Sequence, residues 1–183
     1  VFFDRMALVD SLLTTTAVWT FYLSIVTAKT LRLDLAMLTG FALGASFLTK
    51  SPALFFAILL PAAILVVDWP AKGKERFIVL SRFVFLTGVS LLIGYGIYNI
   101  MRLGPNFHLL SSRNLDYVYP YTHILESPFN PLVPHLKATL NYFWLMGPGV
   151  LLALFVLGTF YSFKEKPKET LLILVWILFP LLA

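Results

Sequence analysis

Long stretches without a charged residue constrain this chain more than any other feature. They cover residues 11–28, 35–49, 51–67, 83–101, 138–163 and 170–183. A transmembrane helix needs roughly 20 apolar residues, and fewer where flanking Lys or Arg side chains reach the interface. The chain is 59% hydrophobic and only 13% charged, whereas a typical soluble domain has about 25% charged residues. We therefore predict an all-α fold, a polytopic transmembrane bundle of about six helices.

The predicted spans belong to a single transmembrane domain over residues 1–183. Lys50-Ser51-Pro52 is expected to form a turn between two short spans. Lys50 would be costly at mid-membrane, and a proline disfavours helical backbone at the residue before it. The predicted boundaries are about 7–28, 34–50, 52–68, 78–101, 138–163 and 169–183.

Proline and glycine modify three of these spans. Pro61 is expected to kink the third span, and residues 147–149 (Gly-Pro-Gly) to loosen the fifth near its outer end. Gly40 and Gly44 form a GxxxG pair, which permits close helix packing.

The basic residues predict which side each loop faces. Loops 29–34, 68–77 and 164–169 share one side if the spans alternate, and they hold eight Lys or Arg in 22 residues. The long loop 102–137 lies on the opposite side and holds three in 36. The positive-inside rule makes the short loops cytoplasmic and the long loop extracytoplasmic. We therefore predict a multi-pass protein of the inner (plasma) membrane.

Other classes are disfavoured by composition. The chain has no cysteine, so it has no disulfide or thiolate metal site. Its net charge of +5 comes from basic residues scattered over short loops, which does not favour nucleic-acid binding. The chain opens on Val1 and stops within an apolar run, so we interpret it as an internal piece of a longer polytopic protein.

Asp10 is the candidate catalytic residue and Lys50 a candidate phosphate-binding residue, both at the predicted outer ends of spans. An acid just inside a transmembrane helix indicates function by default. The alternative for Asp10 is a helix N-terminal acid that pairs with Arg5. Lys50 would either bind a phosphate as a point charge or anchor the helix end by snorkelling.

The outer loop supplies the remaining candidates. Arginine, amide, acid and phenol groups suit the binding of a phosphate and sugar hydroxyls. A loop held together by its own Arg113–Asp116 ion pair would have the same sequence. The three histidines of the loop match no compact metal motif, so no metal or other cofactor is predicted, although a divalent metal stays open. The candidate binding residues are Arg102, Arg113, Asn114, Asp116 and Tyr117.

Several motifs in succession resemble one enzyme family. RMALVDSLLTT, GFALGASFLTKSPAL, a basic loop and GPNFHLLSSRNLDYVYP resemble the bacterial protein-mannosyltransferase-like and aminoarabinose-transferase-like enzymes. These glycosyltransferases of family 39 type have the GT-C architecture. The resemblance spans most of the chain, although each motif alone is short.

The resemblance implies a membrane glycosyltransferase with an extracytoplasmic active site. Such enzymes move a sugar from a polyprenyl-phosphate donor to a protein, lipid or glycan acceptor. Asp10 matches the family's second acidic position and Lys50 the lysine that closes the LTK helix, while Arg113 and Asn114 fall in a loop that contacts the carrier phosphate or shapes the cavity. The family's principal catalytic acid lies upstream of this chain, so the chain alone is expected to be inactive.

Two other functions are compatible with the same sequence. A transporter or flippase for a lipid-linked or anionic solute would have polar residues deep in several spans, and here these are mostly Ser and Thr. A non-catalytic membrane subunit would use the outer loop as a docking surface. Membrane lipids are expected partners in every case.

Overall fold

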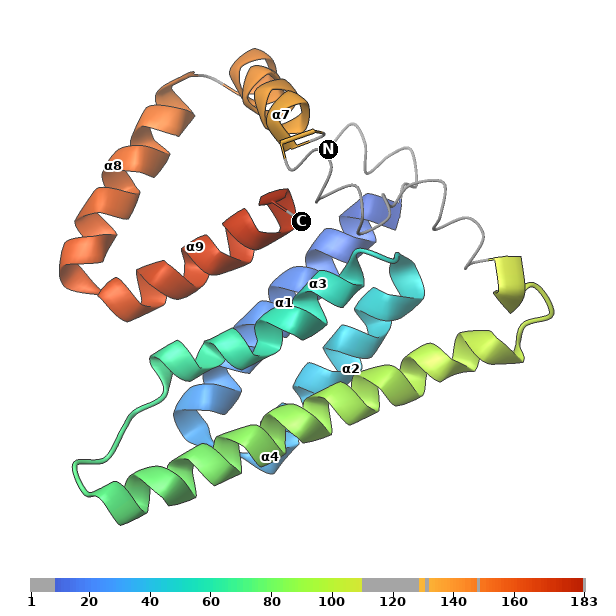
Figure 1. Cartoon of the computed structure of the whole chain (residues 1–183), viewed down its shortest axis with the longest axis vertical. Coiled ribbons are helices and arrows are strands. Elements are labelled where there is room, and N and C mark those ends of the chain that lie inside the picture. Colours follow the sequence, from blue (N-terminus) through green and yellow to red (C-terminus); the bar gives the residue numbers. More distant parts are fainter. Residues whose placement is uncertain (1–8, 110–128, 131, 148, 183) are drawn as a thin grey trace. The chain divides into compact units, whose positions relative to one another are not determined.

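The structure is a computed structural model that describes residues 9–109, 129–130, 132–147 and 149–182. All regular elements in these ranges are helical, with no strand, which confirms the predicted all-α class. The chain divides into two compact units, Val1–Phe107 and His108–Ala183 (Figure 1).

The first unit is a bundle of consecutive helices. Figure 1 shows that the chain reverses direction between α1 and α2, so that these two helices run antiparallel. The elements are α1 (Val9–Thr30), α2 (Leu33–Thr49), α3 (Ala53–Leu59), η2 (Leu60–Val66), α4 (Gly73–Tyr98) and η3 (Asn99–Leu103).

Two stretches of the described chain are long and apolar enough to cross a membrane: Val9–Thr30 and Gly73–Leu103. The bent helix pair of the second unit adds a third if it forms one span. Association with a membrane is therefore supported by helix length and composition. The full set of six spans and their sidedness stay predictions.

The turn predicted at Lys50-Ser51-Pro52 is present, whereas Pro61 coincides only with a change of helix type. Lys50 leaves α2 with an extended backbone, and the N–H of Ala53 bonds to its carbonyl oxygen at 3.1 Å. This places residues 33–49 and 53–66 in separate helices. Next to Pro61 the α-helix becomes a 3₁₀ helix, because a proline in a helix removes one backbone donor.

The core of the first unit is centred on α2, which packs against α1 on one side and α4 on the other. Gly40 and Gly44 confirm the predicted close packing, since their missing side chains leave room for Ile93 and Ile97 of α4. A Cβ at Gly44 would lie 2.7 Å from the Cβ of Ile97. From the other helix, Gly94 makes room for Leu43 in the same way.

Buried hydroxyl groups cross the same interfaces. The Ser90 hydroxyl of α4 donates to the Ala36 carbonyl oxygen of α2 at 2.7 Å. The hydroxyls of Thr27 and Thr39 lie 3.2 Å apart between α1 and α2. Thr39 also donates to the Leu35 carbonyl of its own helix at 2.8 Å. Each hydroxyl therefore has a partner, which removes the cost of burying a polar group.

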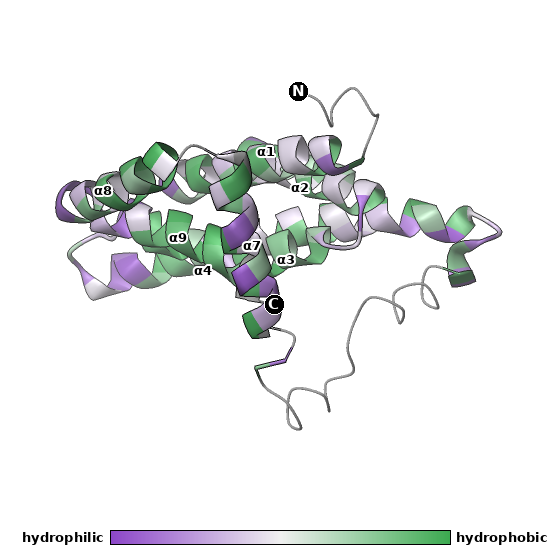
Figure 2. Ribbon diagram, turned by 90° about the horizontal axis from the view of Figure 1, so that it is seen from above, coloured by the Kyte–Doolittle hydropathy of each residue, from purple (hydrophilic) through white to green (hydrophobic). Residues whose placement is uncertain are grey.

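The second unit contains α7 (Leu132–Met146), α8 (Gly149–Glu165) and α9 (Pro167–Leu182). Figure 2 shows hydrophobic residues along most of α8 and α9, with hydrophilic residues where these two helices meet. The sequence predicts one span over 138–163, but the structure has two helices bent by 113° at residues 147–149. α7 thus ends at Met146 and a new helix begins at Gly149, where the sequence predicted only a loosened helix; glycine disfavours continued helix.

We expect Gly44→Ala to destabilise the first unit. The added methyl group would meet the β-branched Ile97, whose side chain has one strongly preferred rotamer in a helix. Overpacking of this kind costs about 1–3 kcal/mol. Unfolding of the detergent-solubilised protein by heat or denaturant measures the loss.

Gly96→Ala is the matched control. Gly96 also lies in a helix, and a Cβ there meets no atom within 4 Å. The control should unfold at or above the temperature of the native protein, because Ala favours helix over Gly. Equal destabilisation by both changes would contradict the packing role of Gly44.

Candidate functional site

The structure brings together two residues that the sequence places 40 positions apart. Asp10 lies in the first turn of α1, and Lys50 follows the last residue of α2. The Lys50 Nζ donates to Asp10 Oδ1 at 2.6 Å and forms a salt bridge. The Asp10 side chain is 58% exposed and the Lys50 side chain is 45% exposed. The pair therefore sits at an open end of the antiparallel helices.

The register of α1 explains why Asp10 faces α2. Thr20, Ser24 and Thr27 are buried, and all three lie at helical spacing on one side of α1. Leu13 and Ala17 continue this series towards the N-terminus and are half-buried. Positions three and four apart share a helix face, so Asp10 is the last member of the series and lies beside the end of α2.

The ion pair leaves unused hydrogen-bonding capacity. A lysine ammonium has three N–H donors and a carboxylate has several acceptor sites. Asp10 takes one donor of Lys50. Both side chains reach solvent, so an anionic ligand can approach the ammonium without the pair leaving its place. Lys50 is thus positioned by a partner, which the snorkelling alternative did not anticipate.

Arg102 lies at the end of the long helix of the first unit, in η3. Its guanidinium carbon is 5.6 Å from the centre of the Phe107 ring, a cation–π arrangement. The centroids of the Phe107 and Tyr98 rings are 6.3 Å apart, and those of the Tyr98 and Phe47 rings are 5.6 Å apart. Phe47 belongs to α2. Phe47 precedes Lys50 by three residues. A continuous row of rings thus connects Arg102 to the end of α2 that carries Lys50.

This aromatic row was not predicted to belong to the site. Tyr98 also stacks on Tyr95, one turn earlier in the same helix, with the ring centroids 6.3 Å apart. Two tyrosines three positions apart, followed by an arginine, were the available signal in the sequence. The contact with Phe47 required the packing of α2 on α4.

The other predicted binding residues lie outside the described residues. The structure makes no statement about the Arg5 alternative for Asp10 or the Arg113–Asp116 alternative for the loop, for the same reason. Within the described ranges, no three His, Asp or Glu side chains come close enough to hold a metal ion. The predicted binding residues outside the described ranges are Arg113, Asn114, Asp116 and Tyr117.

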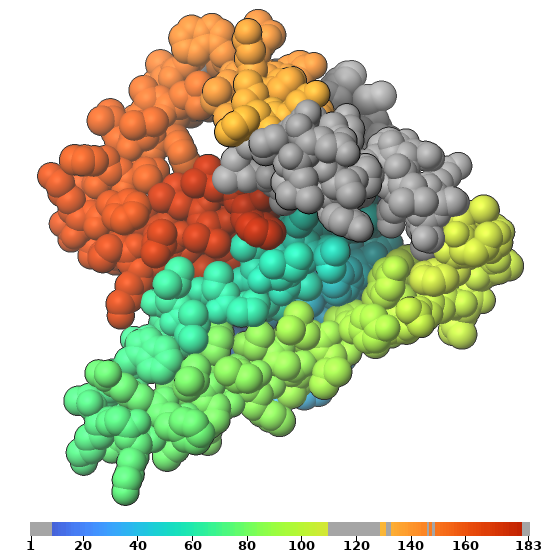
Figure 3. Space-filling view, viewed as in Figure 1, coloured from blue at the N-terminus to red at the C-terminus, as the bar shows by residue number. Residues whose placement is uncertain are grey.

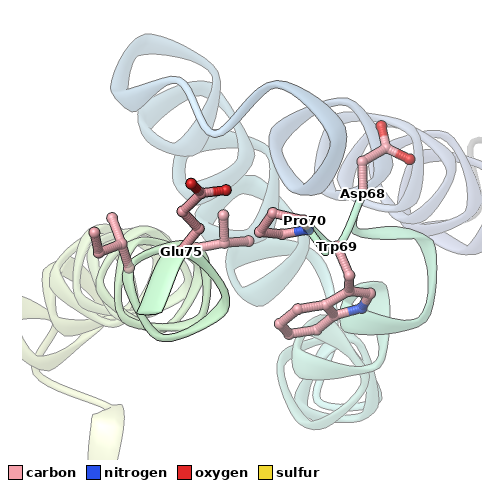
Figure 4. A pocket seen from close by; sticks show the side chains of 6 residues that line it. Asp68, Trp69, Pro70 and Glu75 are labelled. Atoms are coloured by element: carbon pink, nitrogen blue, oxygen red, sulfur yellow. The ribbon is translucent and has the colours of Figure 1, made fainter. Parts of the chain in front are cut away.

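A shallow hollow of about 480 Å³ lies between the end of η2 and the start of α4. Asp68, Trp69, Pro70 and Glu75 line it together with apolar residues. Figure 4 shows the carboxylates of Asp68 and Glu75 on one side of Pro70, with the Trp69 indole on the other. Two carboxylates at the rim disfavour an anionic ligand, so this hollow is a poor place for a phosphate.

No protein-family model matches the chain, and neither a curated protein nor a solved structure shows significant similarity to it. The resemblance to the GT-C glycosyltransferases therefore stays a prediction. What the structure adds is the geometry of the Asp10–Lys50 pair, which was not part of that resemblance.

We expect the Asp10–Lys50 pair to add little to the free energy of unfolding. Exposed ion pairs contribute about 0.2–1 kcal/mol in double-mutant cycles, and both of these side chains are about half exposed. The cycle would use Asp10→Asn, Lys50→Gln and the double variant, with unfolding in detergent as the measurement. Arg32 and Asp34, an exposed pair at the start of α2, provide a second cycle for comparison.

A coupling energy well above 1 kcal/mol for Asp10–Lys50 would contradict this expectation. It would mean that the pair holds α1 on α2. A small coupling energy would mean that the pair is not needed for stability, which leaves room for a functional role.

Proposed function

We propose that this chain is part of an integral membrane glycosyltransferase that uses a polyprenyl-phosphate-linked sugar as donor. The observation that carries the proposal is the Asp10–Lys50 pair, a positioned and exposed cation at the end of an apolar helix. The resemblance described above supplies the reaction class. The acceptor is a hydroxyl or a lipid phosphate on the extracytoplasmic side.

The transfer has two electrostatic requirements. An oxygen atom of the acceptor attacks the anomeric carbon, the bond from this carbon to the donor phosphate breaks, and the phosphate leaves with the bonding electrons. A hydroxyl acceptor also gives up its proton to a base. A cation beside the phosphate stabilises the charge that develops on the leaving oxygen, and a carboxylate deprotonates or orients the acceptor.

The geometry favours a division of labour between the two residues. Lys50 binds the donor phosphate through ammonium N–H groups that Asp10 does not use. Asp10 holds the ammonium in place by its hydrogen bond of 2.6 Å. The resemblance assigns the principal catalytic base to a segment upstream of this chain, so Asp10 acts as the second, positioning carboxylate.

Arg102 extends the cationic surface at the same end of the first unit. Its guanidinium rests on Phe107 and keeps its N–H groups available for phosphate or hydroxyl oxygens. Among the described residues the row of rings between Arg102 and α2 offers faces on which a sugar or a prenyl chain can lie.

Transport of a lipid-linked or anionic solute is the rival function. Its support is the series of buried hydroxyls in α1 and α2, which includes Thr20 and Thr39. These hydroxyls already bond to backbone carbonyl oxygens, at 2.8 Å in both cases. They therefore act as packing groups, and we rank transport second.

The test compares variants of the full-length protein in membranes supplied with radiolabelled polyprenyl-phosphate sugars. We expect Lys50→Gln to lower transfer at least tenfold, because the leaving phosphate loses a charge-assisted hydrogen bond of about 1.5–3 kcal/mol. Asp10→Asn should lower it less, and the double variant no further than Lys50→Gln alone. Asp34→Asn, which breaks the exposed pair at the other end of α2, is the control and should keep full transfer.

Full transfer by Lys50→Gln would remove the lysine from the mechanism. A double variant much worse than both single variants would give Asp10 an independent role as a base. Donor-dependent flux in proteoliposomes without transfer to any acceptor would favour the transporter.

A further inference from the structure

The helix α7 differs from the other long helices of the described chain in how its side chains are distributed. It has the strongest separation of apolar from polar residues among the helices of at least 15 residues. At about 100° per residue, five large apolar side chains fall within an arc of roughly 100°. They are Val133, Leu136, Leu140, Phe143 and Trp144.

The polar residues of α7 all lie outside this arc, where they alternate with Tyr and with apolar residues that include Leu145. Lys137 and Asn141 lie next to one another on the side that follows the apolar arc, and His135 lies opposite. All five apolar side chains are exposed in the second unit, from 39% for Leu136 to 68% for Trp144. Apart from Trp144, whose ring lies beside Gly149, the apolar arc is thus not used to pack α7 onto α8 or α9.

α8 has the opposite character. Its exposed apolar residues surround the helix: at 100° per residue, Leu151, Leu157 and Phe163 lie about 120° apart around the axis. A helix that is apolar on all sides suits the hydrocarbon core. With 17 residues it is about 26 Å long, close to the thickness of that core.

The helices α7 and α8 run in different directions. The two axes differ by 113°, which is 23° from a right angle. If α8 runs along the membrane normal, the axis of α7 is tilted by about 23° from the membrane plane. Figure 3 shows a gap between α7 and α8 away from the segment that joins them.

We propose that α7 lies in the interface of the bilayer as an amphipathic surface helix and is not part of a transmembrane span. Its occupant is the lipid surface: the apolar arc enters the boundary between headgroups and acyl chains. Lys137 and Asn141 face the headgroups and water. Apolar residues that include Trp, Phe and Leu, with a Lys beside them, are typical of helices that bind in this way.

Two features favour lipid over a protein partner. Trp144 stands at the end of α7 that adjoins α8, where an indole is best placed at the headgroup level. Lys137 borders the apolar arc, and its long stem lets the ammonium reach lipid phosphates while the arc stays buried. Association of the chain with a membrane is supported by its long apolar helices independently of the proposed enzyme activity.

The experiment uses the absence of cysteine from this sequence. Single cysteines replace residues in the full-length protein, are spin-labelled, and are reconstituted in liposomes of phosphatidylethanolamine and phosphatidylglycerol. Collision rates with oxygen and with a water-soluble nickel chelate give the depth of each label. The apolar-face series is Val133→Cys, Leu136→Cys, Leu140→Cys and Trp144→Cys, and the polar-face series is Lys137→Cys and Asn141→Cys.

We expect the apolar-face labels to lie at nearly constant depth, within about 7 Å, with more oxygen than nickel collisions. The polar-face labels should show the reverse. A helix that spans the membrane would instead change depth by about 1.5 Å per residue, or roughly 16 Å between positions 133 and 144. Labels at Leu151, Leu154 and Tyr161 of α8 are the internal control and should show that gradient.

Three results would overturn the proposal. A steady change of depth along α7 would make it one arm of a broken span. Low collision rates with both reagents on the apolar arc would mean that protein covers it. High nickel collision rates on both faces would place α7 in water. Glycosyl transfer assayed on the same variants is a separate measurement, so the orientation of α7 and the enzyme activity can fail independently.

Discussion

The close approach of α2 to α4 is the contact on which the first unit depends. Lipid chains are as apolar as leucine side chains, so helices in a bilayer gain little by burying apolar surface against one another. Small residues allow contact between backbones instead, and Gly40, Gly44 and Gly94 provide it here. The Ser90–Ala36 hydrogen bond crosses the same interface and fixes its register.

The position of the candidate site follows from that packing. α2 is held against α4 by glycines and against α1 by a Thr27–Thr39 contact, so its end is fixed relative to both neighbours. Lys50 therefore meets Asp10 of α1 on one side, while Phe47 contacts Tyr98 of α4 on the other. A lysine at a helix end would otherwise be a mobile charge. Here its ammonium has a defined place, as the binding of a phosphate requires.

The second unit is governed by a different constraint. The Gly-Pro-Gly segment at residues 147–149 ends one helix and lets the next begin in a new direction. The apolar stretch over residues 138–163 is long enough for one span. It is divided between α7, which is amphipathic, and α8, which is not. Composition averaged over such a stretch hides the difference, because His135, Lys137 and Asn141 all belong to α7, whereas α8 has no charged residue before Lys164.

Much of the local structure was determined by the sequence alone. The all-α class and the turn at Lys50 were predictable, because each depends on residues near one another in the chain. The GxxxG pair at Gly40 and Gly44 also predicted a close helix contact, but not which helix would supply it. Tertiary structure decided what distant residues do together. Asp10 and Lys50 were each candidates, but their pairing depends on the antiparallel register of α1 and α2, and the row of rings to Arg102 depends on α2 packing on α4. Helical periodicity assigns a residue to a face of its own helix; only the packed bundle determines which other face it meets.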